Sequence, residues 1–476
     1  MYISKKKIFS FIIYGIFGLL IFSSTILIRD NSLQNWIDII SVILLTLIFI
    51  QYFIMKKLNL GIFSFIGIFL MFTYLFHFGN VILLSSPLKS IGLGSFVVNV
   101  VGPEYFKDAV IYCLYFVYIL FWGVIFATKS KNVKKFYLNE EIEASNLMMS
   151  RFLGKVLFIF GVPVFLYISF SKLNASFTGD YLDTFEVQQS IPSFLNFLST
   201  MMNVGICLLL IGYKNNLRVA RGILLISIFL QIISMFSGSR GIAVIAIVLY
   251  LFVYIKIVNK VKLKNIITYL VIGYIGLALI SSIRSIRDFG MDLGKIIEEF
   301  IVKLTNENLL LTTLNEFGGT LLTPAVAIQS VPNNVDPGYG LTYVNSVANL
   351  IGVNIGEIEI GSFVELINIG AMGGSYIGEA YYNFLNLGWL VAFIIGFLIC
   401  KVSNKIDLYI YIKDYLKIGY YFPLLIAAFW WVRDSFNYFA RISIAGALFY
   451  YILIVTTKFI LIKYKYPNKK YGKSLY

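Results

Sequence analysis

Stretches of about 20 apolar residues recur along the whole chain, separated by shorter polar segments. A helix of about that length crosses the roughly 30 Å of hydrocarbon in a lipid bilayer. The strands of a membrane barrel would instead alternate apolar and polar positions. The pattern therefore predicts an all-α integral membrane protein with about twelve transmembrane helices. The apolar stretches lie at residues 8–28, 36–55, 59–84, 109–128, 152–171, 193–213, 222–237, 241–258, 265–283, 376–400, 418–433 and 441–462.

Composition supports this class and narrows the function. Of 476 residues, 59% are hydrophobic and only 13% are charged, which is far more apolar than a soluble domain. The first apolar stretch is followed by polar residues rather than by a small-residue cleavage site, so we expect it to stay in the protein. The three cysteines fall inside apolar stretches without metal-ligand spacing, which favours packing roles over a metal site.

The formal net charge of +15 raises the question of a nucleic-acid partner. In a membrane protein, a basic excess is more simply explained by cytoplasmic loops that face anionic lipid. We therefore expect the membrane lipid, and no nucleic acid, as the partner of these charges. No cofactor is indicated.

The distribution of lysine fixes the direction of the chain. If the lysines at residues 5–7 are cytoplasmic, 25 of the 30 lysines fall on the cytoplasmic side of the predicted helices. Both termini are then cytoplasmic, and residues 1–476 form a single polytopic membrane domain. The topology predicts one large segment outside, residues 284–375, between the ninth and tenth spans. Its apolar residues recur too closely for a linker, so we expect it to fold over the outer face as a lid or wall.

The arginines are distributed between the two sides of the membrane differently from the lysines. Only three of the nine arginines lie on the cytoplasmic side, and most of the 24 acidic residues also lie outside. Because the planar guanidinium group binds phosphate or carboxylate with two parallel hydrogen bonds, this asymmetry predicts an outward-facing anion site. The alternative is that these arginines extend to lipid headgroups or pair with nearby acids, which we favour for Arg29 beside Asp30. The six outer arginines are Arg29, Arg240, Arg284, Arg287, Arg433 and Arg441.

The sequence FSGSRGIAV, residues 236–244, interrupts an apolar run that extends from residue 222 to residue 255. As one helix this run would be about 50 Å long, which exceeds the thickness of the hydrocarbon layer. A turn within the interruption instead divides the run into two short spans. It also keeps every later lysine-rich loop on the cytoplasmic side.

That turn has the composition of an anion-binding helix start. The eighth span begins outside, so its first backbone N–H groups and the positive end of its dipole face outward. Gly238 and Gly241 allow a tight turn and a close approach of the backbone, and Ser237 or Ser239 can cap the helix. Arg240 adds a full positive charge.

Charged side chains at the ends of other spans also suggest a site, because their burial costs free energy. Arg433 and Arg441 flank the last loop, and Glu379 lies at the start of the tenth span. The neighbouring aromatic residues are explained more simply as an interfacial belt, and the only histidine, His77, as a packed or capping residue. The belt residues are Tyr381, Tyr382, Trp430 and Trp431.

Four segments together resemble a known family. In order they are FSGSRGIAV, LNEFGGTLLTP, GGSYIGEAYYNFLNLGWL and RDSFNYFAR. In that order, and with the predicted topology and outer loop, they resemble the bacterial O-antigen polymerase family, the Wzy-type oligosaccharide repeat-unit polymerases. The resemblance extends over roughly residues 230–445, and no single segment is specific on its own.

The resemblance implies an integral-membrane glycosyltransferase of the C-type class. Such an enzyme moves a growing glycan from undecaprenyl diphosphate to the terminal sugar of a new lipid-linked repeat unit. The reaction would take place at the outer leaflet of the bacterial cytoplasmic (inner) membrane, in the synthesis of lipopolysaccharide or a related surface polysaccharide. Lipid-linked oligosaccharides are the implied substrates, and a chain-length regulator protein is an implied partner.

The resemblance also assigns roles to residues. Arg240 and Arg433 would act catalytically by stabilising the diphosphate leaving group, which requires no metal. Glu379 or Glu316 would accept the proton of the attacking hydroxyl, although either could instead pair with the arginines. The residues implied to bind the diphosphate or the glycan are Arg284, Arg287, Arg441, Gly238, Ser239, Gly241 and Tyr381.

Three other functions are compatible with a chain of this kind. An O-antigen ligase would share the fold class and the donor. A flippase or transporter of lipid-linked oligosaccharides would need polar groups on both sides of the membrane midplane, whereas here they gather on the outer side. A membrane scaffold without activity would tolerate the exchange of its outer arginines for lysine.

Overall fold

The computed structural model describes residues 5–89, 92–128, 140–178, 190–236, 240–259, 308–353 and 373–465, with a few single residues between these ranges. Within them all regular structure is helical, and ten helical segments are long and apolar enough to cross a membrane. The chain is therefore an all-α, multi-pass membrane protein, as the apolar pattern predicts. The ten segments correspond to ten of the predicted spans. The ninth, 265–283, lies outside the described residues, so the total of about twelve stays a prediction.

The membrane-crossing helices alternate with several short ones. In chain order the elements are α1 (Lys5–Leu27), α2 (Leu33–Lys57), α3 (Phe65–Leu84), α4 (Phe96–Val101), α5 (Pro103–Ala127), α6 (Glu140–Thr178), α8 (Ser193–Gly212), α9 (Leu217–Phe236), α10 (Arg240–Val253), η2 (Tyr254–Val258), α13 (Leu309–Gly318), η4 (Gly319–Leu321), α14 (Leu322–Ser330), α15 (Leu341–Ala348), η5 (Asn349–Ile351), α17 (Tyr376–Phe384), η6 (Leu385–Leu387), α18 (Gly388–Tyr411), α19 (Tyr415–Gly419), α20 (Phe422–Trp431), α21 (Phe436–Ala440), η7 (Arg441–Ala445) and α22 (Gly446–Lys465).

The eleventh predicted span, 418–433, differs from a simple helix. It consists of α19 and α20, which are separated by a break at Tyr420 and Tyr421. Pro423 lies in the first turn of α20, where its missing N–H group is tolerated because that group has no helical partner. The ten residues of α20 extend only about 15 Å, roughly half the hydrocarbon thickness. This half-length helix ends at Trp431, two residues before Arg433, one of the predicted site residues.

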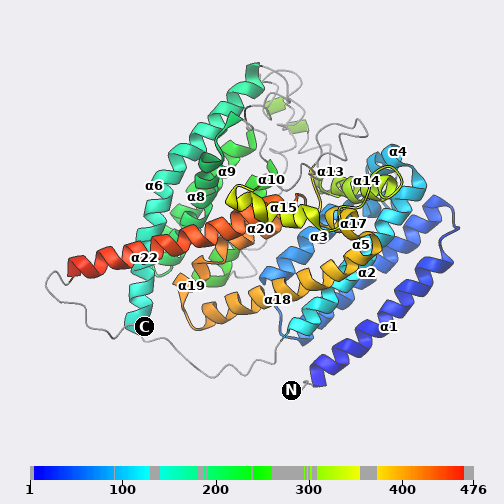
Figure 1. Cartoon of the computed structure of the whole chain (residues 1–476), viewed down its shortest axis with the longest axis horizontal. Coiled ribbons are helices and arrows are strands. Elements are labelled where there is room, and N and C mark those ends of the chain that lie inside the picture. The colour runs from blue at the N-terminus through cyan, green and yellow to red at the C-terminus, as the bar shows by residue number, and fades with distance from the viewer. Residues whose placement is uncertain are drawn as a thin grey trace.

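One group of helices contains α1, α2, α3, α5 and α18 (Figure 1). Glycine lets α18 pack directly on α5, since a Cβ atom on Gly396 would lie 1.9 Å from the carbonyl oxygen of Leu120. A buried polar chain joins three further helices of the group. Gln51 donates to the Tyr14 hydroxyl at 2.9 Å, and the Tyr74 hydroxyl donates to the side-chain oxygen of Gln51 at 2.8 Å.

A second group contains α6, α8, α9, α10 and α22, on the other side of the ribbon in Figure 1. Glycines again allow close packing, because a Cβ atom on Gly154 of α6 would lie 2.9 Å from the carbonyl oxygen of Gly205 of α8. Gln231 donates to Asn203 at 3.1 Å and to the Tyr250 hydroxyl at 3.0 Å, so one buried triad connects α8, α9 and α10. Such hydrogen bonds stabilise the packing of membrane helices. Apolar side chains add little there, because lipid tails are as apolar as the neighbouring helix.

The longest element is α6, whose 39 residues extend about 58 Å along one side of the second group. This length exceeds the roughly 30 Å of hydrocarbon even if the helix is tilted. Pro163 lies inside the helix without ending it. The helix therefore continues beyond the membrane core.

Helix ends that the lysine distribution assigns to one side of the membrane do lie together. The Lys7 ammonium group donates to the carbonyl oxygens of Phe126 at 2.9 Å and Thr128 at 3.1 Å, which joins the start of α1 to the end of α5. Lys256 and Asp407 form an ion pair of 3.5 Å between η2 and α18. We refer to the helix ends that carry Lys7, Lys214, Lys256 and Lys413 as the lysine end of the protein.

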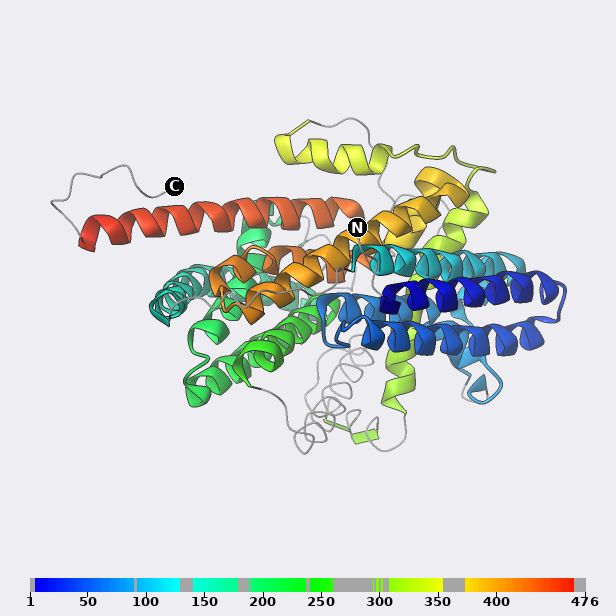
Figure 2. The ribbon, with the colours of Figure 1, turned by 90° about the horizontal axis from the view of Figure 1, so that it is seen from below.

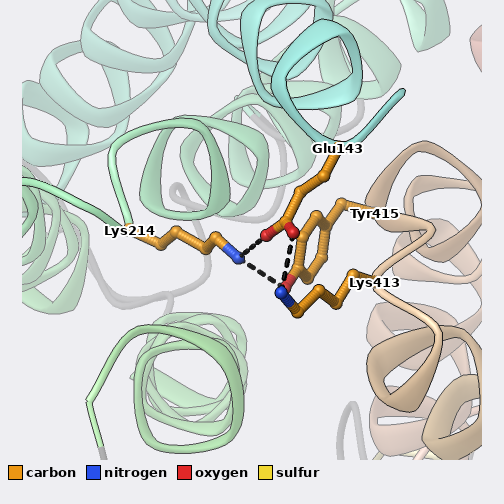
Figure 3. Close-up of polar contacts among 4 residues, drawn as sticks. All are labelled: Glu143, Lys214, Lys413 and Tyr415. Atoms are coloured by element: carbon orange, nitrogen blue, oxygen red, sulfur yellow. Dashed lines mark hydrogen bonds and ion pairs between the residues drawn. The ribbon is translucent and has the colours of Figure 1, made fainter. Parts of the chain in front are cut away.

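A polar cluster at the lysine end surrounds Glu143 (Figure 3). One carboxylate oxygen accepts a hydrogen bond from Lys214, and the other accepts from Lys413 at 2.8 Å. Lys214 also donates to the Tyr415 hydroxyl at 2.6 Å. The cluster joins the start of α6, the turn after α8 and the connection between α18 and α19.

We expect the substitution Glu143→Ala to destabilise the protein by about 1–3 kcal/mol, because it leaves two neighbouring ammonium groups without their shared carboxylate. The side chains of Glu143 and Lys214 are only 14% and 12% exposed, so water cannot fully replace the lost contacts. The measurement is the thermal midpoint in detergent. Glu141→Ala, an exposed carboxylate on the same turn, is the matched control and should leave the midpoint unchanged. Equal midpoints for the two variants would contradict the structural role of the cluster.

Candidate functional site

The two groups of helices meet where α10 begins and α20 ends. Gly241, the second residue of α10, packs directly against the turn that follows α20. A Cβ atom at this position would lie 2.9 Å from the ring of Trp430 and 3.1 Å from Nη1 of Arg433. Glycine is therefore needed here for close approach, as the sequence predicts for this turn.

The guanidinium group of Arg433 lies between the two groups of helices. Its Cζ atom is 5.3 Å from the ring centre of Trp430 and 5.6 Å from that of Phe76 on α3, both within the range of cation–π attraction. Its third neighbour is the Gly241 backbone. Because α10 begins at Arg240, the partial positive charge of the first turn of α10 adds to the charge of Arg433.

The turn that carries Arg433 is held by the next residue. The Asp434 carboxylate accepts hydrogen bonds from the indole N–H of Trp430 and, at 2.6 Å, from the backbone N–H of Ser435. Burial raises the pKa of Asp434, and these hydrogen bonds and the nearby Arg433 charge oppose that rise. Both carboxylate oxygens of Asp434 thus stabilise the turn itself.

The glycines before α17 lie against the same turn. A Cβ atom on Gly374 would lie 2.8 Å from the carbonyl carbon of Asp434, and one on Gly373 would lie 3.0 Å from the carbonyl oxygen of Arg433. The Thr323 hydroxyl donates to the carbonyl oxygen of Gly373 at 2.8 Å. The four sequence segments of the predicted family resemblance are therefore neighbours in space, at least through Gly241, Thr323, Gly373 and Arg433.

Ser375 caps α17 with the help of His77. The Ser375 oxygen accepts hydrogen bonds from the backbone N–H groups of Ile377 at 3.2 Å and Gly378 at 3.3 Å. Nδ1 of His77 lies 3.1 Å from the carbonyl oxygen of Thr73, so Nδ1 carries the proton. Nε2 is then the acceptor for the Ser375 hydroxyl at 2.7 Å. A neutral His77 therefore fixes the start of α17 beside the Arg433 turn.

Glu379, one helical turn further along α17, connects three elements. Its side chain is fully buried, with 1% exposure. The Thr342 hydroxyl of α15 donates to Oε1 at 2.9 Å, and the backbone N–H of Phe436, the first residue of α21, donates to Oε2 at 2.7 Å. Asn383 donates to the Thr342 oxygen at 2.7 Å. Both carboxylate oxygens of Glu379 therefore have protein donors.

Three other predicted site residues are Arg441, Glu316 and Tyr381, and each lies on a different helix. Arg441 is exposed and begins η7, a π-helical turn of a kind that often marks functional sites. Glu316 is half-buried on α13, next to Phe317, whose ring lies 4.9 Å from the ring of Phe76. Tyr381 faces away from Glu379, since its ring lies 4.9 Å from that of Tyr112 on α5.

The remaining predicted residues cannot be placed in full. The backbone of Arg240 begins α10, but its side chain is outside the description. Four others lie outside the described residues altogether, as do residues 354–372 and most of residues 284–307 of the predicted outer loop. These four are Gly238, Ser239, Arg284 and Arg287.

Sequence reasoning missed several residues that build the site. Ser375 could have been found, because a serine directly before a helical stretch is a capping signal. Thr342 and Asn383 carry no such signal, since their roles depend on contacts between distant segments. The contacts of Asp434 are local, with Trp430 and Ser435. Within the described ranges no group of three or more histidine, cysteine or acidic residues is arranged to hold a metal ion.

Comparison with known proteins gives one match. The model of the family described as O-antigen polysaccharide polymerase Wzy matches residues 8–363, about three quarters of the chain. No curated protein and no solved structure matches the sequence. The matched range contains the segments 236–244 and 314–324 and ends before the segments 373–390 and 433–441.

Proposed function

The chain belongs to the O-antigen polysaccharide polymerase Wzy family, and from this we propose that it uses undecaprenyl-diphosphate-linked glycan as its donor. Family membership makes it a membrane polymerase of the glycosyltransferase type that acts on lipid-linked oligosaccharides. In the proposed reaction, the growing glycan moves to the terminal sugar of a new lipid-linked repeat unit. The lipid-linked donor and the residues that act on it are the new elements of the proposal.

The position of Arg433 is the observation that carries this proposal. Its guanidinium group lies against Gly241 at the start of α10, between Trp430 and Phe76. A fixed cation beside a helix N-terminus suits a phosphate group, because the full charge and the backbone N–H groups act on the same anion. The three flanking groups limit the motion of the guanidinium group, so little rearrangement is needed during reaction.

The chemistry needs such a cation at the leaving group. A hydroxyl oxygen of the acceptor sugar attacks the anomeric carbon of the donor glycan and forms the new glycosidic bond. The bond from that carbon to the diphosphate oxygen breaks, and its electron pair stays on undecaprenyl diphosphate. Arg433 stabilises the charge that develops there, and we assign Arg240, Arg284, Arg287 and Arg441 to the same diphosphate or to the adjoining glycan.

The hydroxyl proton needs an acceptor, and two carboxylates are candidates. Glu379 is poorly suited, because both of its oxygens accept hydrogen bonds from the protein. Glu316 is half-buried on α13, which packs on α3 beside Phe76. We therefore assign proton acceptance to Glu316 and a positioning role to Glu379.

The proposal includes a direction in the membrane. The lysine end would face the cytoplasm, together with both termini, and the Arg433 site would face the exterior side of the cytoplasmic membrane. The helix ends that carry Gly241, Ser375 and Arg433 lie together, as a single outward site requires. A chain-length regulator protein remains a proposed partner in the same membrane.

Purified protein in lipid nanodiscs should convert undecaprenyl-diphosphate-linked repeat units into a ladder of longer lipid-linked products without added metal or nucleotide sugar. Each step should release one undecaprenyl diphosphate. A ligase would leave the repeat units unchanged until lipid A is supplied, and a flippase would form no new bond in either case. In cells, loss of the protein should leave single repeat units on lipid A, whereas loss of a ligase would accumulate undecaprenyl-linked polymer.

A further inference from the structure

The helix α15 exposes its apolar face and buries its polar face, the reverse of what is expected for a helix on a loop in water. Its exposed face consists of Leu341, Val344 and Val347, which are 50%, 54% and 48% exposed. The face turned into the protein carries the hydroxyl groups of Thr342 and Ser346, which are 7% and 4% exposed. In water an amphipathic helix buries its apolar face and exposes its polar one. The opposite arrangement is stable only where the exposed face meets an apolar medium.

The two inward hydroxyl groups of Thr342 and Ser346 have hydrogen-bond partners, whereas the buried Tyr343 hydroxyl of the same helix has none within the described residues. Thr342 donates to Glu379, and Ser346 donates to the carbonyl oxygen of Thr342 within the helix. A backbone donor at each end also has a partner. The backbone N–H of Gly340 donates to Asn383 at 3.0 Å, and that of Gly352 donates to the carbonyl oxygen of Asn349 at 3.2 Å. A helix in hydrocarbon needs this internal pairing, because no water is present to replace it.

The sequence around α15 contains no charged residue. Between Asp336 and Glu357 there is no charged residue over 20 consecutive positions. The exposed apolar face continues at Ile351, which is 80% exposed. Glycines with left-handed backbone angles bound the helix on both sides, at Gly340 and Gly352. The segment thus carries no charge that would keep it out of the bilayer, and its eight-residue helix is too short to cross it.

The neighbours of α15 already face lipid. The helix packs on α21, the first turn of the candidate span Phe436–Phe459, and the rings of Tyr343 and Phe436 lie 5.1 Å apart. Further along that span Leu448 is 59% exposed. In Figure 2, α15 is the yellow helix at the margin of the ribbon. The helix α15 therefore packs on the first turn of a candidate membrane span that exposes apolar side chains further along.

We propose that α15 lies in the bilayer, in the leaflet on the side of the Arg433 site, with Leu341, Val344, Val347 and Ile351 in contact with lipid acyl chains. Part of the predicted outer loop 284–375 is then a membrane-inserted element, rather than a lid that rests in water on the outer face. Through Thr342, α15 is joined to Glu379 and from there to the Arg433 turn.

Cysteine variants test the proposal without any measurement of activity, so its failure and that of the proposed function are distinguishable. Val344→Cys reports on α15, Leu390→Cys on the lipid-facing side of α18, and Glu104→Cys on a water-exposed helix start. The three native cysteines are buried, and the unsubstituted protein gives their background reaction. All variants are studied in phosphatidylcholine nanodiscs, which leave both faces of the bilayer accessible.

A sulfonated maleimide, which stays in water, should react with Val344→Cys at least tenfold more slowly than with Glu104→Cys. Bimane attached at residue 344 should be quenched by brominated acyl chains as strongly as bimane at residue 390. Fast reaction with the maleimide would overturn the proposal, because the helix would then face water. Slow reaction without quenching by brominated lipid would also overturn it, because a second copy or another protein would then cover the helix.

Discussion

Arg433→Ala is expected to lower the rate of chain extension by roughly 100- to 1000-fold, the loss that follows removal of one fixed donor to a developing negative charge. Arg433→Lys should also lose at least tenfold. An ammonium group keeps the charge, but it lacks the planar fork and the stacking on Trp430 and Phe76. The measurement is the ladder of lipid-linked products formed by the purified protein in nanodiscs.

Arg218→Ala is the matched control, because Arg218 is exposed in the first turn of α9 and lies outside the site. Its product ladder should equal that of the unsubstituted protein. Thermal midpoints of all three variants separate loss of chemistry from loss of folding. A normal ladder from Arg433→Ala would overturn the assignment of Arg433 to the diphosphate leaving group, whatever the effect of the lysine variant.

Glu379→Ala and Glu379→Gln should differ strongly from each other. Alanine leaves the Phe436 N–H and the Thr342 hydroxyl without their acceptor in a buried site, at a cost of about 1–3 kcal/mol for each group. We expect a lower thermal midpoint and about 100-fold slower chain extension, because the start of α21 and the Arg433 turn lose their anchor. Glutamine can still accept from Phe436 and donate to the Thr342 oxygen, so it should keep at least a tenth of the rate.

This pair of variants distinguishes a positioning role from a proton-accepting one. A glutamine cannot accept the proton of the sugar hydroxyl, so a catalytic base at residue 379 would lose about 100- to 10,000-fold in both variants. Glu316→Gln should show that large loss instead, with an unchanged thermal midpoint. Near-normal extension by Glu316→Gln together with an inactive, stable Glu379→Gln would reverse our assignment of the two carboxylates.

The membrane-spanning helices could be predicted from the sequence, because a span needs only sufficient length and apolar character to cross the hydrocarbon layer. The helix Leu33–Lys57 is an example. The break between α19 and α20 escaped prediction, since 418–433 is as apolar as a continuous span and the adjacent Pro423 is tolerated in a first helical turn. The reversed helix α15 escaped too. Its eight residues give too short a pattern, and the inward direction of Thr342 depends on Glu379.

The site was partly predictable for the same physical reason. Arg433 and Gly241 stood out because a charge at a span end and a glycine in an apolar run each need a special explanation. The contacts that give them a common location join residues far apart in the chain. Glu379 and Phe436 are 57 positions apart, and His77 and Ser375 are 298 apart. Neither separation leaves a trace in local periodicity, so the supporting residues emerge only from the fold.

The excess length of α6 has a practical consequence for imaging. Small membrane proteins with little mass outside the bilayer are hard to orient in single-particle micrographs, and a marker protein on a flexible linker adds mass without direction. The first turns of α6 are instead continuous with its membrane-crossing part and are braced by Glu143 and Lys214. A helical fusion joined in register to this end would hold a soluble marker at a fixed angle and so provide a handle for alignment.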